Sequence, residues 1–163
     1  MPMLDVYIPE GAMRAEAERA LLGRLTEILL RWEAFDPADS AIRSVSWAFL
    51  HRPVDVYVAG APAALPRYKV VASVPEGQLD ERARAAVVAE VTEAVLDAEE
   101  GARPREEGRV WVFPTEIPEG HWGGNGRITP LAAILERQTD DAERARALAA
   151  EWIAASRAAR TRV

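Results

Sequence analysis

The sequence has no cysteine and only two histidines, His51 and His121, among its 163 residues. The absence of cysteine excludes disulfides, thiolate metal ligands and a cysteine nucleophile. The two histidines show no HExxH or similar spacing of the kind that binds a metal ion. We therefore expect no metal site and no cofactor.

Long apolar runs are absent as well. No stretch reaches the ~20 consecutive apolar residues that span a membrane, and the start of the chain does not resemble a signal peptide. Lysine is almost absent, since Lys69 stands against nineteen arginines, and alanine is abundant. That composition suggests GC-rich codons and a bacterial source. Together these features predict a cytoplasmic protein with no membrane partner.

The charge balance argues against a nucleic-acid partner. The formal net charge is −6, and the arginines are interleaved with acidic residues. Phosphate binding requires a clustered basic face instead. With 49% hydrophobic and 28% charged residues, the composition is typical of a globular chain with one core.

An internal repeat organises most of the chain. Residues 2–62 align without a gap on residues 68–128, at an offset of 66, and both copies carry Pro-Glu-Gly after an apolar segment. Arg43 falls on Arg109 in this alignment. Units of about sixty residues are marginal alone, so we expect the two copies to share a core.

Each copy has the pattern strand, helix, strand, because alternating apolar residues give way to helical spacing and then to a second strand-like run. The expected segments are strand 3–8, helix 12–32 and strand 42–50, then strand 68–74, helix 79–96 and strand 109–113. A short extended segment at 54–58 precedes a linker at 60–67. Thr139-Asp140-Asp141 is expected to cap a last helix with an apolar stripe of Ala145, Leu148, Ala149, Trp152 and Ile153.

These elements predict an α+β (α/β) fold, in which two fused βαβ units form a four-stranded sheet with two helices on one face. We expect one domain over residues 1–138, made of units 2–62 and 68–128, and a C-terminal helical extension over 139–163. The other face of the sheet needs a cover. A second copy of the chain can supply it, so we expect a closed homo-oligomer.

Pro2 is the first candidate for chemistry. Removal of the initiator Met would leave Pro2 with a secondary amine, and an α-amino group titrates near about 7.7–8.0, lower in an apolar pocket. Such an amine can act as a general base without a cofactor. The structural alternative is that proline merely fixes φ at the start of the first strand. Pro2 falls on Tyr68, so only the first copy can present a terminal proline.

The terminal proline, the Pro-Glu-Gly break, the amphipathic helix and the segment Thr115-Glu116-Ile117-Pro118-Glu119-Gly120-His121-Trp122-Gly123-Gly124 together resemble the tautomerase superfamily. The segment 115–124 is similar to the 4-oxalocrotonate tautomerase group. The fused length and the strand 110–113 are more similar to the cis-3-chloroacrylic acid dehalogenase group. The resemblance covers residues 2–128 and implies a trimer of double βαβ chains, with Pro2 as catalytic base or acid.

The sequence departs from that family at the carboxylate-binding arginines. Their positions fall on Ala12, Gln78, Val45 and Trp111, and the family's pocket phenylalanine falls on Trp122. The positions implied by the dehalogenase group hold Leu29, Pro75, Gln78, Phe113 and Gly124. Groups that activate water and polarise an acid are therefore missing, and we do not expect a dehalogenase.

The expected substrate pocket is therefore apolar and aromatic. We expect Trp111, Phe113 and Trp122 to line it and Gln78 to be a neutral hydrogen bonder. Arg127 is a candidate anchor, as are Arg67 and Arg109; for each the alternative is a solvated or inter-subunit ion pair. Tyr7 is interpreted as a strand residue, Glu116 as a solvated acid and His121 as part of a turn.

Three functions remain open at this stage. The first is a cofactor-independent tautomerase that transfers a proton next to a carbonyl, with a small carbonyl or enol substrate. The second uses Pro2 covalently as an iminium-forming amine, for a decarboxylation, a hydration or a carbon–carbon bond step. The third is a non-catalytic trimeric binding or scaffold protein.

Overall fold

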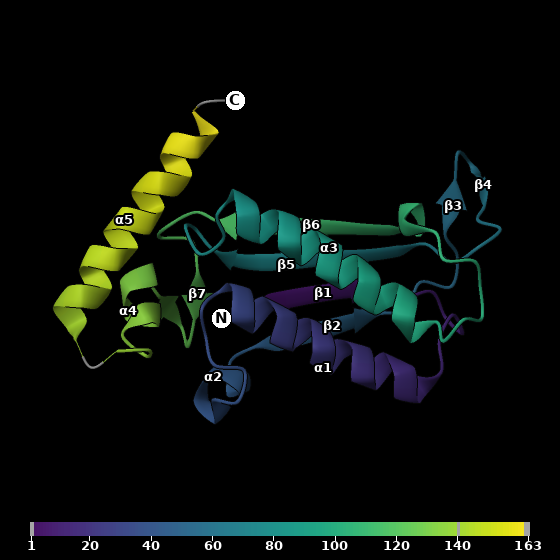
Figure 1. Ribbon diagram of the computed structural model, residues 1–163, viewed down its shortest axis with the longest axis horizontal. Helices are drawn as coiled ribbons and strands as arrows, with labels where there is room; N and C mark the ends of the chain where they lie inside the picture. Colours follow the sequence, from purple (N-terminus) through teal and green to yellow (C-terminus); the bar gives the residue numbers. More distant parts are fainter. Residues whose placement is uncertain (1, 140, 162–163) are drawn as a thin grey trace.

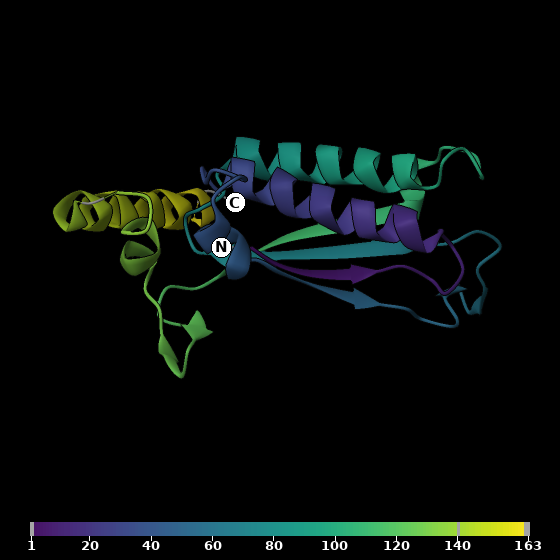
Figure 2. The same ribbon diagram turned by 90° about the horizontal axis from the view of Figure 1, so that it is seen from below.

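The computed structural model describes residues 2–139 and 141–161, and these form a four-stranded sheet with two long helices on one face (Figures 1 and 2). The spatial order of the strands is β2 (Trp47–His51), β1 (Met3–Tyr7), β5 (Tyr68–Pro75) and β6 (Val110–Ile117). Each βαβ unit pairs its strands in parallel, and β1 and β5 join the two units in antiparallel. The expected fold is confirmed.

Two helices, α1 (Ala15–Trp32) and α3 (Glu81–Ala98), bury the apolar face of the sheet. Side chains of a strand alternate between its faces, and in β1 it is Leu4 and Val6 that are buried while their neighbours are partly exposed. In β5 the same alternation buries Val70, Ala72 and Val74. One core cluster joins these residues to both helices.

The repeat is exact through the first strand and the helix, because α1 and α3 begin and end 66 residues apart. Beyond the helices the expected gap-free alignment is wrong. Trp47 pairs with Met3, and Trp111 pairs with Lys69. The second strands therefore correspond at an offset of 64, which places Trp47 on Trp111.

The reason for this shift is a helical turn that the sequence analysis assigned to a strand. Residues Ser40–Ser44 form the short helix α2, and the strand begins only at Trp47. The side chain of Asp39 caps α2 by accepting hydrogen bonds from the backbone N–H of Ala41 and Ile42. Burial of Ile42 in a separate apolar cluster favours the turn over an extended chain.

The remaining elements are short, except the last helix. They are β3 (Tyr57–Val58), β4 (Ala61–Pro62), the 3-10 turn Glu107–Arg109, β7 (Gly123–Gly124), β8 (Arg127–Ile128), α4 (Leu131–Leu135) and α5 (Ala142–Arg160). β3 and β4 form a hairpin that includes the start of the expected linker. Among the described residues, no helix combines the length and the apolar character needed to cross a membrane.

The C-terminal extension docks through the apolar stripe that the sequence predicts. Asp141 caps α5, whereas Asp140 lies outside the described residues. Ala145 and Ala149 are buried against Leu131 and Leu135 of α4. Figure 1 shows α5 beyond the end of the sheet where α1 ends and α3 begins.

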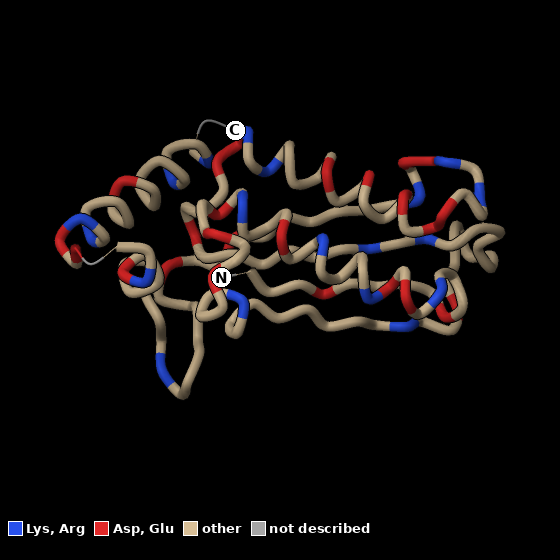
Figure 3. The backbone as a smooth tube through the Cα atoms, turned by 60° about the horizontal axis from the view of Figure 1, so that its bottom comes forward, with Lys and Arg blue, Asp and Glu red and all other residues tan. Residues whose placement is uncertain are grey.

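The sheet face opposite the helices carries large exposed aromatic side chains. Trp47 and Phe49 form an edge-to-face pair on β2, with ring centroids 6.4 Å apart, and Trp111 and Phe113 form its counterpart on β6, at 6.3 Å. Trp111 is 66% exposed. Basic and acidic residues are interspersed along the chain, as Figure 3 shows. The exposed face also carries the pair of Asp5 and His51.

Candidate functional site

Pro2 is buried immediately before β1. It continues the alternation of Leu4 and Val6, so it belongs to the layer between the sheet and the helices. Because β1 and β5 are antiparallel, Pro2 lies at the end of the sheet where β5 ends at Pro75. α1 ends and α3 begins at the same end, as Figure 1 shows.

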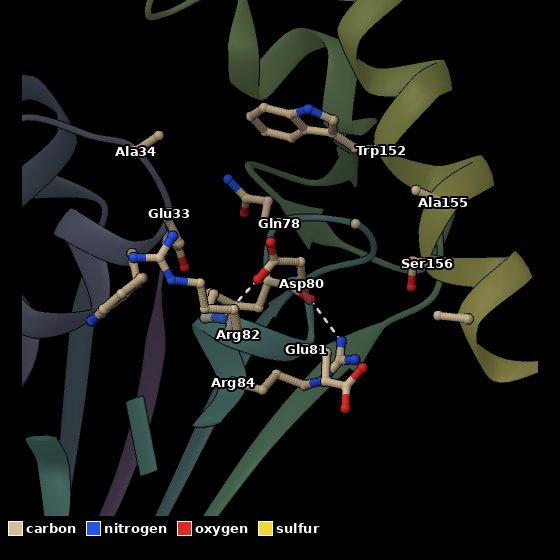
Figure 4. A pocket seen from close by; sticks show the side chains of 15 residues that line it. Glu33, Ala34, Gln78, Asp80, Glu81, Arg82, Arg84, Trp152, Ala155 and Ser156 are labelled. Atoms are coloured by element: carbon tan, nitrogen blue, oxygen red, sulfur yellow. Dashed lines mark hydrogen bonds between the residues drawn. The ribbon is translucent and has the colours of Figure 1, made fainter. Parts of the chain in front are cut away.

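A cavity of about 440 Å³ opens at this end, between the end of α1, the turn before α3 and the helix α5 (Figure 4). Its volume lies within the range of small-molecule sites. Trp32 and Glu33 line it from α1, Gln78 from the turn, and Trp152 and Ser156 from α5. Pro2 is not among the lining residues; it lies at the same end of the sheet, in the layer beneath.

Gln78 is the polar group of this cavity with the clearest need for a ligand. Its side chain is 6% exposed, and neither its amide nitrogen nor its amide oxygen has a partner among the described residues. In Figure 4 its carboxamide points into the space between Ala34 and Trp152. An unpartnered buried amide costs about 1–3 kcal/mol. A ligand with an acceptor and a donor would satisfy both atoms.

Glu33 is a buried carboxylic acid at the end of α1. It is 1% exposed, and burial raises the pKa of its carboxyl above the ordinary value. In the sequence Glu33 looks like a surface residue, because an acid after the last turn of an amphipathic helix is usually solvated.

The helix α5 is held against the turn at residues 76–78 by buried acids. Glu76 accepts hydrogen bonds from Arg157 (3.1 Å) and Arg160 (2.7 Å) of α5 and from the backbone N–H of Glu119 (2.9 Å). The hydrogen bond from Arg157 holds the pKa of Glu76 below its usual range, against the opposing effect of burial.

Glu116 makes the second contact of this kind. Its carboxylate accepts from the backbone N–H of Gly77 at 2.9 Å and from the Ser156 hydroxyl at 2.7 Å. The expectation that Glu116 is a solvated acid is therefore wrong, because α5, which has no counterpart in the repeat, covers it. α5 is a fixed wall of the cavity.

The chain brings only some of the expected site residues together. Pro2 and Gln78 lie at the same end of the sheet. Trp122 and Arg127 belong to the segment that leaves β6 at this end, where Trp122 packs in the apolar cluster of Ile42 and Arg127 is exposed. The other two, Trp111 and Phe113, lie on the open face of β6 and do not line the cavity of Gln78; Trp111 lines a second cavity at the opposite end of the sheet.

Arg109 is excluded as a substrate anchor. It is 1% exposed, and its guanidinium donates to the carboxylate of Glu99 at 2.8 Å. The same carboxylate accepts from the hydroxyl of Tyr68 at 2.6 Å. Both alternatives considered for Arg109, a solvated and an inter-subunit ion pair, are thus replaced by a buried pair within the chain.

No family model and no curated protein matches the sequence. Solved structures do share its fold. The wild-type symmetric trimer of the fused 4-OT called Q0 is 22% identical, with a TM-score of 0.63 over 81% of this chain and 96% of that one.

Two further structures show the same likeness. Pt0534 inactivated by 2-oxo-3-pentynoate is 21% identical, with a TM-score of 0.63 over 78% of this chain and 95% of that one. N1, a member of the cis-3-chloroacrylic acid dehalogenase family, is 18% identical, with a TM-score of 0.64 over 78% of this chain and 83% of that one. The chain therefore has the fold of the fused proteins of the tautomerase superfamily.

Proposed function

From this fold, we propose that the chain is a cofactor-independent tautomerase that interconverts the enol and keto forms of a small carbonyl compound. Pro2, freed by removal of Met1, is the proposed base. Its nitrogen takes the proton from the enol hydroxyl or from the α-carbon and returns it to the other position, so no atom is gained or lost. The observation that carries the proposal is the burial of Pro2 at the end of the sheet where a cavity contains an unpartnered Gln78.

The proposed substrate carries no carboxylate at the end that meets Gln78. The basic side chains that line the cavity are the exposed Arg82 and the partly exposed Arg84, and Arg84 donates to the backbone carbonyl of Leu79 at 2.7 Å. A neutral carboxamide can donate to a carbonyl oxygen but supplies no charge to an anion. The walls supplied by Trp32 and Trp152 suit an apolar body.

The proposed assembly is a homotrimer. Fused 4-OT structures with this fold are described as trimers, and the exposed aromatic pairs on the two edge strands β2 and β6 are apolar groups that a neighbouring chain can cover. Trp111 and Phe113 would then lie between chains, where they can still contribute to a neighbouring cavity. Trp122 and Arg127 remain candidates at the Pro2 end.

Ketonisation of phenylenolpyruvate tests the proposed reaction. The intact mass of the purified chain first establishes that it begins at Pro2. We expect Pro2→Ala to slow ketonisation by about a hundredfold or more, the usual contribution of a general acid–base group. Pro62→Ala, in the exposed hairpin of β3 and β4, is the matched control and should leave the rate unchanged. Equal rates in wild type and Pro2→Ala would refute the proposal.

A covalent role is the second candidate, because a buried secondary amine is also a nucleophile. The electrophile 2-oxo-3-pentynoate, which inactivated Pt0534, and an aldehyde with borohydride are suitable probes. Borohydride trapping of an aldehyde on Pro2 during turnover supports the iminium route. Absence of both ketonisation and an adduct in a chain that begins at Pro2 supports a binding or scaffold protein instead.

A further inference from the structure

The two units of the repeat place an acid at the same position. Glu33 directly follows the last residue of α1, and Glu99 directly follows that of α3, 66 residues later. Both side chains are buried. Each is followed by a residue with positive φ, Ala34 at 61° and Glu100 at 52°. The helix ends of the two units therefore have the same backbone conformation, with a buried carboxyl at each.

The second unit shows what this carboxyl faces. Tyr68 stands at the position of Pro2 and, like it, is buried at the start of the unit's first strand. The hydroxyl of Tyr68 donates to Glu99 at 2.6 Å. Glu99, the acid that follows α3, thus contacts the first residue of the first strand in its own unit. The same relationship in the first unit would place Glu33 against the position of Pro2.

Glu33 and Glu99 differ in the side chains that surround them. Although burial opposes it, hydrogen bonds from Arg109 and Tyr68 hold the pKa of Glu99 below its usual range. At the offset of 64 that relates the second strands, Val45 takes the place of Arg109. Val45 packs in the apolar cluster of Ile42, and burial raises the pKa of Glu33. The first unit keeps the acid and replaces the arginine.

We propose that, in the chain that begins at Pro2, the Glu33 carboxylate binds the Pro2 ammonium, the form that the proposed base has once it has accepted a proton. Glu33 is then a positioning residue, which acts on a substrate through the proline. An opposite charge in a dry environment favours the protonated amine, and two strongly coupled groups titrate as a pair. The use of this pair in catalysis rests on the proposed function, whereas the pairing itself does not.

Other charged groups around the cavity have their own contacts. From α3, Asp80 accepts from the backbone N–H of Ala83, and Arg84 donates to Leu79. Arg157 and Arg160 of α5 bind Glu76, and Arg31 of α1 binds Glu90. In α2, Asp39 caps its own helix and Arg43 donates to the carbonyl of Pro37.

Glu81 and Arg82 complete the charged lining. Both are exposed, and in Figure 4 the Arg82 side chain extends toward Glu33. Solvent screens exposed charges, so their effect on a buried amine is small. Glu33 is accordingly the buried ionisable side chain on this cavity wall.

A nitrogen-15 NMR titration of chains with labelled proline tests the pairing directly. After removal of Met1, Pro2 has the one proline nitrogen that titrates, because every other proline nitrogen is a tertiary amide. We expect Glu33→Gln to lower the pKa of Pro2 by one pH unit or more relative to wild type. Glu136→Gln, an exposed acid next to α4, should leave it unchanged.

A second variant keeps the test decisive where Glu33→Gln does not fold. Val45→Arg places a guanidinium where Arg109 stands in the other unit, so it should draw Glu33 away from Pro2 and also lower the pKa of the amine. If the folded variants titrate like wild type, the proposal is overturned. The titration needs no substrate, so an inactive protein would refute the proposed function without affecting this result. If the protein is active, the pH profile of kcat should shift in the same direction as the pKa of the Pro2 amine.

Discussion

Gly77 lies directly against the backbone of Trp152: a Cβ atom at residue 77 would come within 2.8 Å of the Trp152 carbonyl carbon. Gly77 also has a φ of +91°, in the left-handed region that favours glycine. The turn that carries Gln78 and the helix α5 therefore touch through backbone alone. The width of the cavity between them depends on this contact.

Gly77→Ala should displace α5 from the turn. A matched control is Gly101→Ala, where φ is +75° and nothing lies within 4 Å of the added Cβ. The control should lose only about 1–2 kcal/mol of unfolding free energy, because alanine, unlike glycine, disfavours a positive φ. Gly77→Ala should lose more and should also make α5 accessible to protease. Equal losses in urea unfolding, with α5 protected in both variants, would show that the close contact is unimportant.

The attachment of α5 should weaken in acid. The pKa of Glu76 is lowered, chiefly by Arg157, so its contribution to stability is present above the ordinary Glu pKa of about 4.3 and is lost as the pH falls through the lowered value. At pH 7 we expect Glu76→Gln to cost about 1–3 kcal/mol of unfolding free energy. The difference from wild type should shrink steadily below about pH 4.

Urea unfolding between pH 7 and pH 2.5 measures this difference. Glu151→Gln, an exposed acid on α5, is the control and should stay close to wild type throughout. A loss in Glu76→Gln that is the same at every pH would argue that the ion pairs with α5 contribute nothing.

Removing only one partner of the buried pair of Arg109 and Glu99 should lower the free energy of unfolding strongly. Arg109→Met leaves the buried Glu99 carboxylate with Tyr68 and with the more distant Arg103, 3.5 Å away, and loss of one partner of a buried pair typically costs about 3–5 kcal/mol. The double variant Arg109→Met/Glu99→Leu removes both charges and should regain much of that loss. Chemical denaturation of the wild type, both single variants and the double variant measures the coupling. Additive losses would contradict it.

The aromatic residues of the open face should control assembly. Trp47→Lys or Trp111→Lys places a charge on the surface proposed to lie between chains, so each should shift the protein from trimer toward monomer. Val54→Lys, at an exposed position outside the sheet, is the control. Sedimentation equilibrium gives the mass directly. An unchanged trimer in both tryptophan variants would place the interface elsewhere.

Much of the fold follows from local patterns in the sequence. The strands β1 and β5, the helices α1 and α3 and the apolar stripe of α5 all have periodicities that burial confirms. The helix α2 could not be predicted from such a periodicity. Ile42 is apolar in either conformation, and its place in a cluster with Leu30 and Ile134 depends on contacts distant in sequence.

The site was less accessible to prediction for the same reason. Gln78 could be identified by position, since it follows the Pro-Glu-Gly turn. Glu33, Glu116 and Arg109 look like surface residues in the sequence, and only the packing of other segments buries them. The exact correspondence of Glu33 with Glu99 was already present in the repeat. Its meaning depends on the contact between Glu99 and Tyr68.

The cluster of Tyr68, Glu99 and Arg109 fills, in the second unit, the place that Pro2 and Glu33 occupy in the first. The ends of helices α1 and α3 thus have the same backbone conformation, whereas the side chains around them differ. We expect the reactive amine at the Pro2 end, whereas the second unit has a buried ion pair at the corresponding position. Substitutions of Tyr68, Glu99 or Arg109 should therefore change the stability of the fold without changing the substrate preference that we propose for the Pro2 end.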